Sequence, residues 1–345
     1  MARNRTAAAS GPDAAHADGP AGLTLVEAVR LALHRAMAED ERVLVFGEDV
    51  GADGGVFRAT DGLLAQFGAE RVRDTPLSEA LIAGMAVGAA AAGWRPVAEI
   101  QFSGFLYPCI DQLANHAGRL RNRTRGRLAC PMVLRAPYGG GVHAPEHHSE
   151  SIEAMLAHIP GIRVVIPASP ARAYGLLLAA IRDPDPVVFL EPKRIYRAFR
   201  EQVADDGAAL PLDRAFLERQ GGDATLVAWG AMVRECLGAA EILAKEGIAC
   251  DVLDLASLTV LDTDSLLASV EKTGRCVVVQ EAVRHCGFAS EVAACVAERG
   301  LLSLRAPVLR VTGYDTVMPL PRLERAFMPE AGRIAAAVRE AMSYA

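Results

Sequence analysis

The sequence has no long hydrophobic run, no paired cysteine motif and no excess of positive charge. The longest uncharged apolar stretch, residues 80–94, is shorter than the roughly 17–25 residues of a membrane-spanning helix, so no membrane span is predicted. The seven cysteines are scattered without a CxxC pair, which predicts free thiols in a reducing compartment. The net charge of −6 gives no reason to expect nucleic acid, and the basic run at 119–127 is interpreted as a solvated helix end or a subunit contact.

Motifs of several common enzyme classes are also missing. No GxGxxG follows an early strand, which argues against a nicotinamide-binding domain, and no GxxxxGKS or GxxxxGKT of a P-loop NTPase is present. The zinc motif HExxH and the GxSxG nucleophile elbow of α/β-hydrolases are absent as well. These absences argue against four common chemistries of α/β proteins.

Residues 1–22 are rich in Ala, Gly and Pro and show no periodicity, so a disordered tail is predicted there. Arg3 and Arg5 are compatible with a transit peptide, whereas Asp13 and Asp18 are not typical of one, and no apolar segment of a secretory signal is present. A cytoplasmic location is therefore expected.

The rest of the chain alternates between strand-like and helix-like segments in two blocks. In the first block, residues 23–197, short apolar strands are predicted at 42–46, 96–100, 132–135, 163–166 and 186–190. Helices are predicted between them, at 23–37, 78–93, 111–121, 150–158 and 169–181. Apolar strands separated by helices indicate a parallel sheet that is covered on both faces.

A polar stretch with little periodicity, residues 198–222, is predicted to be a linker to the second block, residues 223–345. In this block strands are predicted at 224–229, 249–255, 275–280 and 307–311, and helices at 233–245, 264–271, 289–299 and 322–343. The predicted fold class is therefore α/β, with two doubly wound domains.

Candidate site residues follow the predicted strands, because ligands of open parallel sheets bind beyond the carboxyl ends of the strands. Glu48, Glu79, Gln101 and His148 occupy such positions. Glu48 and Asp49 could bind a ligand donor or a cation, or could belong to an ordinary solvated loop. Glu79 begins a predicted helix, where the helix dipole favours a carboxylate, so it has a structural explanation as well as a functional one.

Three of the eight histidines fall within residues 143–148, after a run of three glycines. A metal site is one interpretation, because imidazole and carboxylate are good ligands for zinc and iron. Pro145, however, disrupts the helical spacing that would present two ligands one turn apart. A catalytic acid–base histidine is favoured, and a loop with a purely structural role is the remaining alternative.

Several segments, in order along the chain, resemble one known family. They include FGEDVGADGGVFRATDGLLAQFG at 46–68, DTPLSE at 74–79, RPVAEIQFSGFLYPCIDQ at 95–112, RAPYGGGVHAPEHHSES at 135–151 and SVEKTGRCVVVQEA at 269–282. Over about residues 23–345 the chain resembles the E1 β subunit of 2-oxo acid dehydrogenase complexes. That family contains pyruvate, branched-chain 2-oxo acid and acetoin enzymes.

The resemblance implies a transketolase-like pyrimidine-binding domain followed by a transketolase C-terminal-like domain. It also implies thiamine diphosphate as cofactor, shared with a separate α subunit in an α2β2 heterotetramer. In the family the α subunit carries a GDG segment that holds Mg²⁺ and the diphosphate, and no GDG occurs in this sequence. The implied reaction is oxidative decarboxylation of a 2-oxo acid, with transfer of the acyl group to the lipoyl domain of the E2 acyltransferase core.

Residue roles follow from the same resemblance. Glu79 matches the family glutamate that hydrogen-bonds the aminopyrimidine ring of the cofactor, and Phe105 matches the aromatic residue that stacks on that ring. His148 matches the histidine near the thiazolium, which assists proton transfer and acyl transfer to the lipoyl group. The positions that match the surroundings of the pyrimidine are Glu48, Leu77 and Gln101.

A structural potassium ion is also implied by the resemblance. The positions that match its ligands are Met132, Ala180, Ile181, Asp183 and Asp185. Oxygen ligands suit a hard cation, but the same residue types also occur in cores and turns.

Alternatives to this interpretation differ in the substrate or in the kind of protein. GGGVHAPE and SLRAPVLRV resemble bacterial pyruvate-type subunits, whereas EHHSES also occurs in branched-chain enzymes, and pyruvate is favoured. Single-chain transketolases and deoxyxylulose phosphate synthases are much longer and carry their own GDG segment. Another alternative is a non-catalytic subunit that only docks E2. The presence of Glu79, Phe105 and His148 argues against this alternative.

Overall fold

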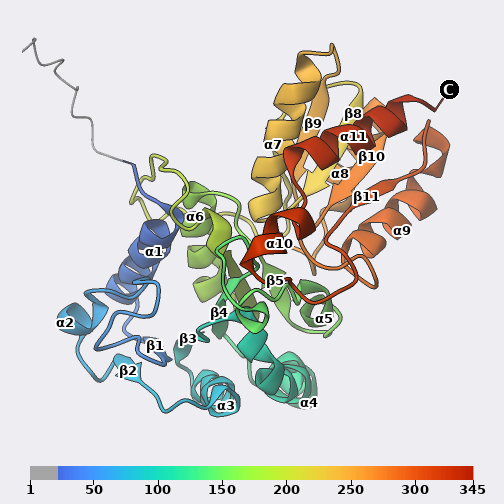
Figure 1. The fold of residues 1–345 in the computed structure, drawn as a ribbon. Helices are drawn as coiled ribbons and strands as arrows, with labels where there is room; N and C mark the ends of the chain where they lie inside the picture. The colour runs from blue at the N-terminus through green and yellow to red at the C-terminus, as the bar shows by residue number, and fades with distance from the viewer. Residues whose placement is uncertain (1–21, 345) are drawn as a thin grey trace, which may run out of the picture.

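The computed structural model describes residues 22–344, which form two α/β domains (Figure 1). The tail predicted at residues 1–22 lies outside the described part apart from its last residue. No helix within residues 22–344 is both long and apolar enough to cross a membrane.

The first domain contains a six-stranded sheet in the order β2-β1-β3-β4-β6-β5, and every neighbouring pair is parallel. Its strands are β1 (Val43–Gly47), β2 (Val72–Asp74), β3 (Arg95–Glu99), β4 (Val133–Tyr138), β5 (Arg163–Val165) and β6 (Val187–Pro192). Its helices are α1 (Leu25–Glu39), α2 (Leu63–Phe67), α3 (Glu79–Ala91), α4 (Leu120–Arg123), α5 (Glu153–Ala157) and α6 (Pro170–Arg182).

Helices cover both faces of this sheet. Strands β4 and β6 are buried at every position, as expected for central strands of a parallel sheet. Helices α1 and α6 pack against each other on one face. Glu27 accepts a hydrogen bond from the backbone N–H of Thr24 at 2.7 Å at the start of α1. The Ser169 side chain caps α6, and Pro170 occupies its first turn.

A buried ion network links three neighbouring strands of the first sheet. Arg135 on β4 is fully buried, and its guanidinium donates to both carboxylate oxygens of Glu191 on β6, at 2.7 and 2.8 Å. It also donates to Glu99 on β3. The Tyr196 hydroxyl completes the network by donating to Glu191. Each buried charge therefore has an oppositely charged partner.

The second domain contains a five-stranded sheet in the order β11-β10-β8-β9-β7. Its strands are β7 (Phe216–Arg219), β8 (Ala224–Ala228), β9 (Cys250–Asp254), β10 (Cys276–Val279) and β11 (Leu309–Val311), with β7 antiparallel to β9 and the other pairs parallel. Its helices are α7 (Ala231–Ala244), α8 (Thr263–Thr273), α9 (Ala289–Arg299), α10 (Pro321–Phe327) and α11 (Ala331–Met342). The prediction of two doubly wound α/β domains is confirmed.

Several individual elements differ from the prediction. The predicted helix 111–121 is a π-helix at Gln112–His116, a 3-10 turn at Ala117–Arg119 and the short α4. The predicted helix 150–158 is helical only in α5. The predicted helix 322–343 is divided into α10 and α11, because Met328 precedes a proline and adopts an extended conformation. Elements α2, β2 and β7 were not predicted, and β7 lies within the predicted linker.

Candidate active site

Four predicted site residues lie at the carboxyl edge of the first sheet. Glu48 directly follows β1, and Glu79 is the first residue of α3, which comes after β2. Gln101 comes shortly after β3, and His148 lies in the loop after β4. Because these strands are parallel neighbours, their carboxyl ends bring the four side chains to one region.

The acidic part of the site is formed by Glu48 and Glu79. Glu48 is 7 % exposed, and burial raises the pKa of its carboxyl, with smaller contributions from the nearby charges of Glu79 and Asp49. Glu79 is half-buried at the start of α3. Gln101 fixes the adjoining loop by donating from Nε2 to Asp49 Oδ2 at 2.9 Å. The site thus presents a buried acid beside a more accessible one.

His148 lies within a cluster of aromatic rings. Its ring centroid is 4.4 Å from that of Phe102, 5.3 Å from that of Phe105 and 4.3 Å from that of His147. Phe57 meets Phe102 edge to face at 5.6 Å. Phe105 and His148 were predicted from the sequence, whereas Phe102 and Phe57 were missed. Phe102 lies two residues after the predicted strand 96–100, a position that could have identified it.

The surroundings of His148 favour its neutral form. The pKa of its imidazole is lowered, first by burial and then by the nearby charges of His147 and Lys193. Its Nδ1 atom is buried and has no hydrogen-bond partner among the described residues. A neutral imidazole can accept a proton from a bound substrate or donate one to it.

The loop that carries His148 lies directly against the turn after β3. The Ser103 hydroxyl donates to the carbonyl oxygen of Glu150 at 2.7 Å. A Cβ atom on Gly104 would collide with the carbonyl oxygen of His147, so only glycine permits this approach. These contacts bring Phe105, in the 3-10 helix Ser103–Cys109, next to the histidine.

An exposed apolar surface adjoins the acidic pair. Leu77 is 79 % exposed on the turn before α3. Leu81 and Met85 on α3, and Trp94 after it, are also exposed. Helix α3 is therefore apolar on its outer side as well as its inner side, a pattern typical of a helix that is covered in an assembly.

The residues at this edge fit an aminopyrimidine ring. Carboxyl groups at Glu48 and Glu79 can hydrogen-bond its nitrogens, and the ring of Phe105 offers an aromatic face. The individual roles given to Glu48, Leu77, Glu79, Gln101, Phe105 and His148 remain predictions.

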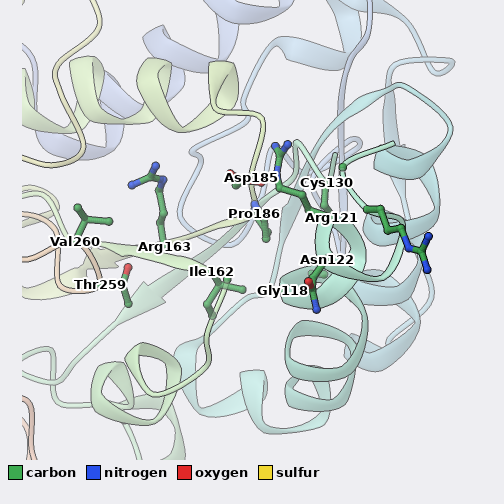
Figure 2. A pocket seen from close by; sticks show the side chains of 14 residues that line it. Gly118, Arg121, Asn122, Cys130, Ile162, Arg163, Asp185, Pro186, Thr259 and Val260 are labelled. Atoms are coloured by element: carbon green, nitrogen blue, oxygen red, sulfur yellow. Dashed lines mark hydrogen bonds and ion pairs between the residues drawn. The ribbon is translucent and has the colours of Figure 1, made fainter. Parts of the chain in front are cut away.

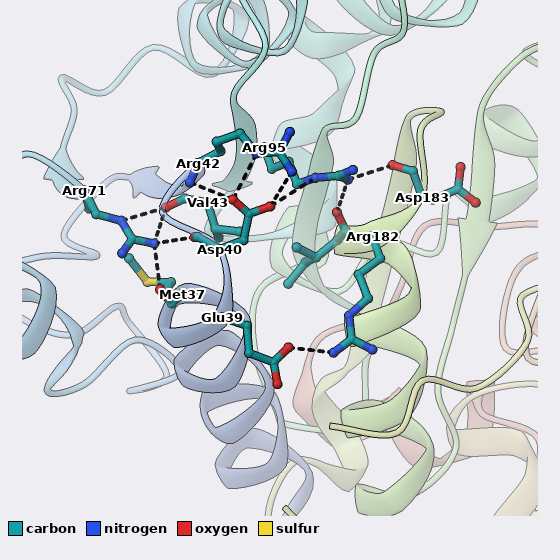
Figure 3. A network of polar contacts seen from close by, with 10 residues as sticks. Met37, Glu39, Asp40, Arg42, Val43, Arg71, Arg95, Arg182 and Asp183 are labelled. Carbon is teal, nitrogen blue, oxygen red and sulfur yellow. Dashed lines mark hydrogen bonds and ion pairs between the residues drawn. The ribbon is translucent and has the colours of Figure 1, made fainter. Parts of the chain in front are cut away.

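Of the residues predicted to bind potassium, four lie at the end of α6 and in the turn to β6 (Ala180, Ile181, Asp183 and Asp185), and Met132 precedes β4. Figure 3 shows Asp183 beside Arg95 and Arg182. Arg95 Nη1 donates to the carbonyl oxygens of Ile181 and Asp183, at 2.7 and 3.3 Å. The Asp183 carboxylate pairs with Arg163 at 3.0 Å, and that of Asp185 pairs with Arg121 at 2.6 Å. Both carboxylates are thus engaged by arginines, while the carbonyl oxygens keep a second lone pair for a cation.

A cavity of ≈ 700 Å³ lies beside this turn (Figure 2). Arg121 and Arg163 line it together with Asp185 and Cys130. Arg121 belongs to the basic run at 119–127, and its ion pair with Asp185 accounts for one charge of that run. Within residues 22–344 no group of three or more His, Cys, Asp and Glu side chains is arranged to hold a metal ion.

Two protein-family models match the chain. The pyrimidine-binding domain of transketolase matches residues 21–198, and the transketolase C-terminal domain matches residues 213–334. Among solved structures, one described as a split gene transketolase, inactive β4 tetramer, has a TM-score of 0.77 and 26% identity, covering 94% of this chain and 99% of that one. A mutant transketolase from Pichia stipitis has a TM-score of 0.69 and 13% identity, covering 94% of this chain and 46% of that one, a likeness of fold alone.

Curated relatives are similar over nearly the whole chain. A protein named pyruvate dehydrogenase E1 component subunit beta from Bacillus subtilis is 48% identical over 324 residues, which cover 94% of this chain and 100% of the relative. The protein of the same name from Acholeplasma laidlawii is 48% identical over 318 residues, covering 92% and 97%.

The fold and the two matched domains define a transketolase-like protein. Within that class, the chain belongs to the family of pyruvate dehydrogenase E1 component β subunits. The resemblance found in the sequence motifs is confirmed.

Proposed function

We propose that this chain is the β subunit of a thiamine diphosphate-dependent E1 component that oxidatively decarboxylates pyruvate. In this proposal the acetyl group passes to the lipoyl domain of an E2 acyltransferase. The observation that carries the proposal is the meeting of Glu48, Glu79, Phe105 and His148 at one sheet edge. It is supported by 48% identity to relatives that bear the pyruvate dehydrogenase name.

Each side chain at this sheet edge has a separate role in the proposed reaction. Glu79 binds a ring nitrogen of the cofactor's aminopyrimidine, and Phe105 stacks on that ring. Glu48 lies nearby, and the charge of Glu79 contributes to the raised pKa of its carboxyl. Neutral His148 exchanges a proton with the substrate or the lipoyl group. Thiamine diphosphate supplies the nucleophilic carbon and the electron sink for decarboxylation.

The proposed enzyme requires an α subunit. The exposed apolar residues Leu77, Leu81, Met85 and Trp94 next to the acidic pair provide a surface for such a partner. The related split gene transketolase is described as inactive in its β4 form, which supports a need for the second chain. Mg²⁺ and the diphosphate are assigned to the α subunit.

A potassium ion is proposed at the turn between α6 and β6, on oxygens of Met132, Ala180, Ile181, Asp183 and Asp185. If it binds there, exchanging potassium for lithium or choline at constant ionic strength should lower the melting temperature. An equal melting temperature in all three salts would contradict this site.

The proposed function is tested by co-expression with a candidate α subunit. Oxidation of pyruvate, 2-oxoisovalerate and acetoin is then measured with thiamine diphosphate, Mg²⁺ and an artificial electron acceptor. We expect activity only when both chains are present, and the highest rate with pyruvate. A preference for another substrate would assign the chain to the branched-chain or acetoin enzymes, and an inert pair that still binds E2 would favour a docking subunit.

A further inference from the structure

The glycine run before His148 forms a concave backbone site for anions. Gly139, Gly141 and His143 have φ angles of 79°, 83° and 59°. Left-handed residues at alternate positions turn successive backbone N–H groups toward one side, which is the arrangement of anion-binding nests in proteins. Such a nest usually binds a phosphate or another free anion.

In this chain carboxyl groups of the second domain occupy the nest. Gly140 N donates to Glu281, which follows β10. Gly141 N donates to Glu324 Oε1 on α10 at 2.7 Å, and His143 N donates to Glu324 Oε2 at 3.1 Å. The nest is therefore filled by protein groups and does not serve as a phosphate site.

The two carboxylates are built into this position. Glu281 is 2 % exposed and Glu324 is 3 % exposed. A Cβ atom on Gly139 would collide with the Glu281 carboxylate, and one on Gly141 would lie 2.7 Å from Arg194 Cδ. The close approach therefore requires glycine, which explains the glycine run that the active-site chemistry leaves unexplained.

A buried cation accompanies the pair. Lys193 is 3 % exposed, and burial lowers the pKa of its ammonium group to about 8, while the charges of Glu281 and Glu324 oppose this effect. Its Nζ atom lies 5.6 Å from the centroid of the Phe102 ring, which contacts His148. The Nζ atom has no hydrogen-bond partner among the described residues, so Lys193 interacts with the two carboxylates of the second domain through charge and not through a hydrogen bond.

The pair accepts hydrogen bonds from the backbone N–H groups of Gly140, Gly141 and His143, whereas the first domain contacts the ends of the loop and His147. The first domain holds the loop where Gly139 N and Ser103 Oγ donate to the carbonyl oxygen of Glu150, at 3.1 and 2.7 Å. The nest residues between these points take their acceptors from the second domain. We propose that Glu281 and Glu324 are positioning residues that fix this loop and so hold His148 against Phe102 and Phe105. The kinetic part of this proposal rests on the proposed function.

Amide hydrogen exchange tests the structural part directly. Removing an acceptor leaves backbone N–H groups of the nest unpaired, so Glu324→Ala and Glu281→Ala should speed exchange in peptides covering 139–148 by tenfold or more. Glu330→Ala is the matched control, because its carboxylate pairs with Arg325 and does not contact the loop. If an alanine variant does not fold, the corresponding glutamine variant is measured. Exchange at the wild-type rate in folded variants overturns the proposal.

A double-mutant cycle with His148 tests the functional part. The assembly with the α subunit is used, and acetyl transfer to a lipoyl domain is measured. Glu324→Ala should lower kcat at least tenfold, and Glu324→Ala/His148→Ala should be no more than twofold slower than His148→Ala alone. If the decreases in kcat of the two single variants multiply in the double variant, Glu324 does not act through His148. If the wild-type assembly has no 2-oxo acid activity, the proposed function fails, and hydrogen exchange still decides whether the pair holds the loop.

Discussion

Two carboxylates with different surroundings stand at the centre of the site. Glu48 is buried and the pKa of its carboxyl is raised by burial, with Glu79 contributing as a neighbouring charge. Glu79 is more accessible and begins α3, so it is the carboxylate that a ligand from solvent or from a partner subunit can reach. Neighbouring acids whose environments differ in this way are common where one of them binds a reacting group.

Glu79→Gln should lower 2-oxo acid oxidation by roughly 10²–10⁴-fold, the range of positioned acid–base groups. The amide keeps the shape of the side chain but cannot exchange a proton. Steady-state rates of the assembled enzyme check this, with circular dichroism to confirm folding. Glu70→Gln is the control, because Glu70 is exposed and pairs with Arg73. Full activity of Glu79→Gln would remove the assigned role.

His148 should act as a neutral base whose protonation begins only in acidic solution. Because burial lowers the pKa of its imidazole, this group becomes charged only at pH values below its usual pKa of about 6.5. The rate of acetyl transfer should therefore be constant above that pH and fall as the pH is lowered further. His148→Ala should lower this rate more than it affects assembly, and His116→Ala, an exposed histidine, is the control. An unchanged rate in His148→Ala would leave the residue with a structural role.

At the scale of elements, the approach of the His148 loop to the 3-10 helix Ser103–Cys109 depends on one glycine. Gly104→Ala should displace the loop, because its Cβ would collide with the carbonyl oxygen of His147. A loss of stability of about 1–3 kcal/mol is expected, together with reduced acetyl transfer. Thermal unfolding and kinetics measure both effects. Gly332→Ala, where a Cβ meets nothing within 4 Å, should lower neither stability nor acetyl transfer.

The predicted elements are determined by local sequence patterns, whereas the missed elements have a weak local pattern or depend on contacts with distant residues. Central strands such as β4 and β6 were predicted because burial on both faces produces continuous apolar runs. Strand β7 was missed because it is an edge strand with two exposed positions, which gives a weak apolar signal. The irregular helix after Asp111 depends on a distant contact, since Gly118 lies against the carbonyl oxygen of Pro160.

The candidate site likewise contains residues that the sequence predicted and residues that it did not. Positions after strands, with the family resemblance, predicted Glu48, Glu79, Gln101 and His148, because their placement follows from the order of parallel strands. Glu281 and Glu324 could not be predicted. Their contacts with the glycine run join positions 141 and 183 residues apart, across two domains, and no local pattern encodes such a pairing.

At the scale of the whole molecule, the interface between the domains contains a buried acid that makes stability depend on pH. Burial raises the pKa of Glu153 from 4.5 to about 7, with Glu281 of the second domain also raising it. At pH values between 4.5 and about 7, Glu153 stays protonated in the folded protein, whereas it loses its proton in the unfolded chain. Stability therefore falls as pH rises through this window, by about 3 kcal/mol in total.

Glu153→Gln removes this titration, so its melting temperature should change less between pH 5 and pH 8 than that of the wild type. Thermal unfolding at both pH values measures the difference, and Glu70→Gln, at an exposed position, serves as the reference. Equal pH dependence in the wild type and Glu153→Gln would show that Glu153 titrates normally.

The buried ion network of the first sheet has a consequence for how the strands align. Arg135 faces Glu99 and Glu191 from the strand between them. Side chains alternate between the two faces of a strand, so a slip of β4 by one residue would move the guanidinium to the opposite, apolar side. Wrong alignments therefore carry an unpaired buried charge, and the apolar strands, which could otherwise slide past one another, have a single permitted register.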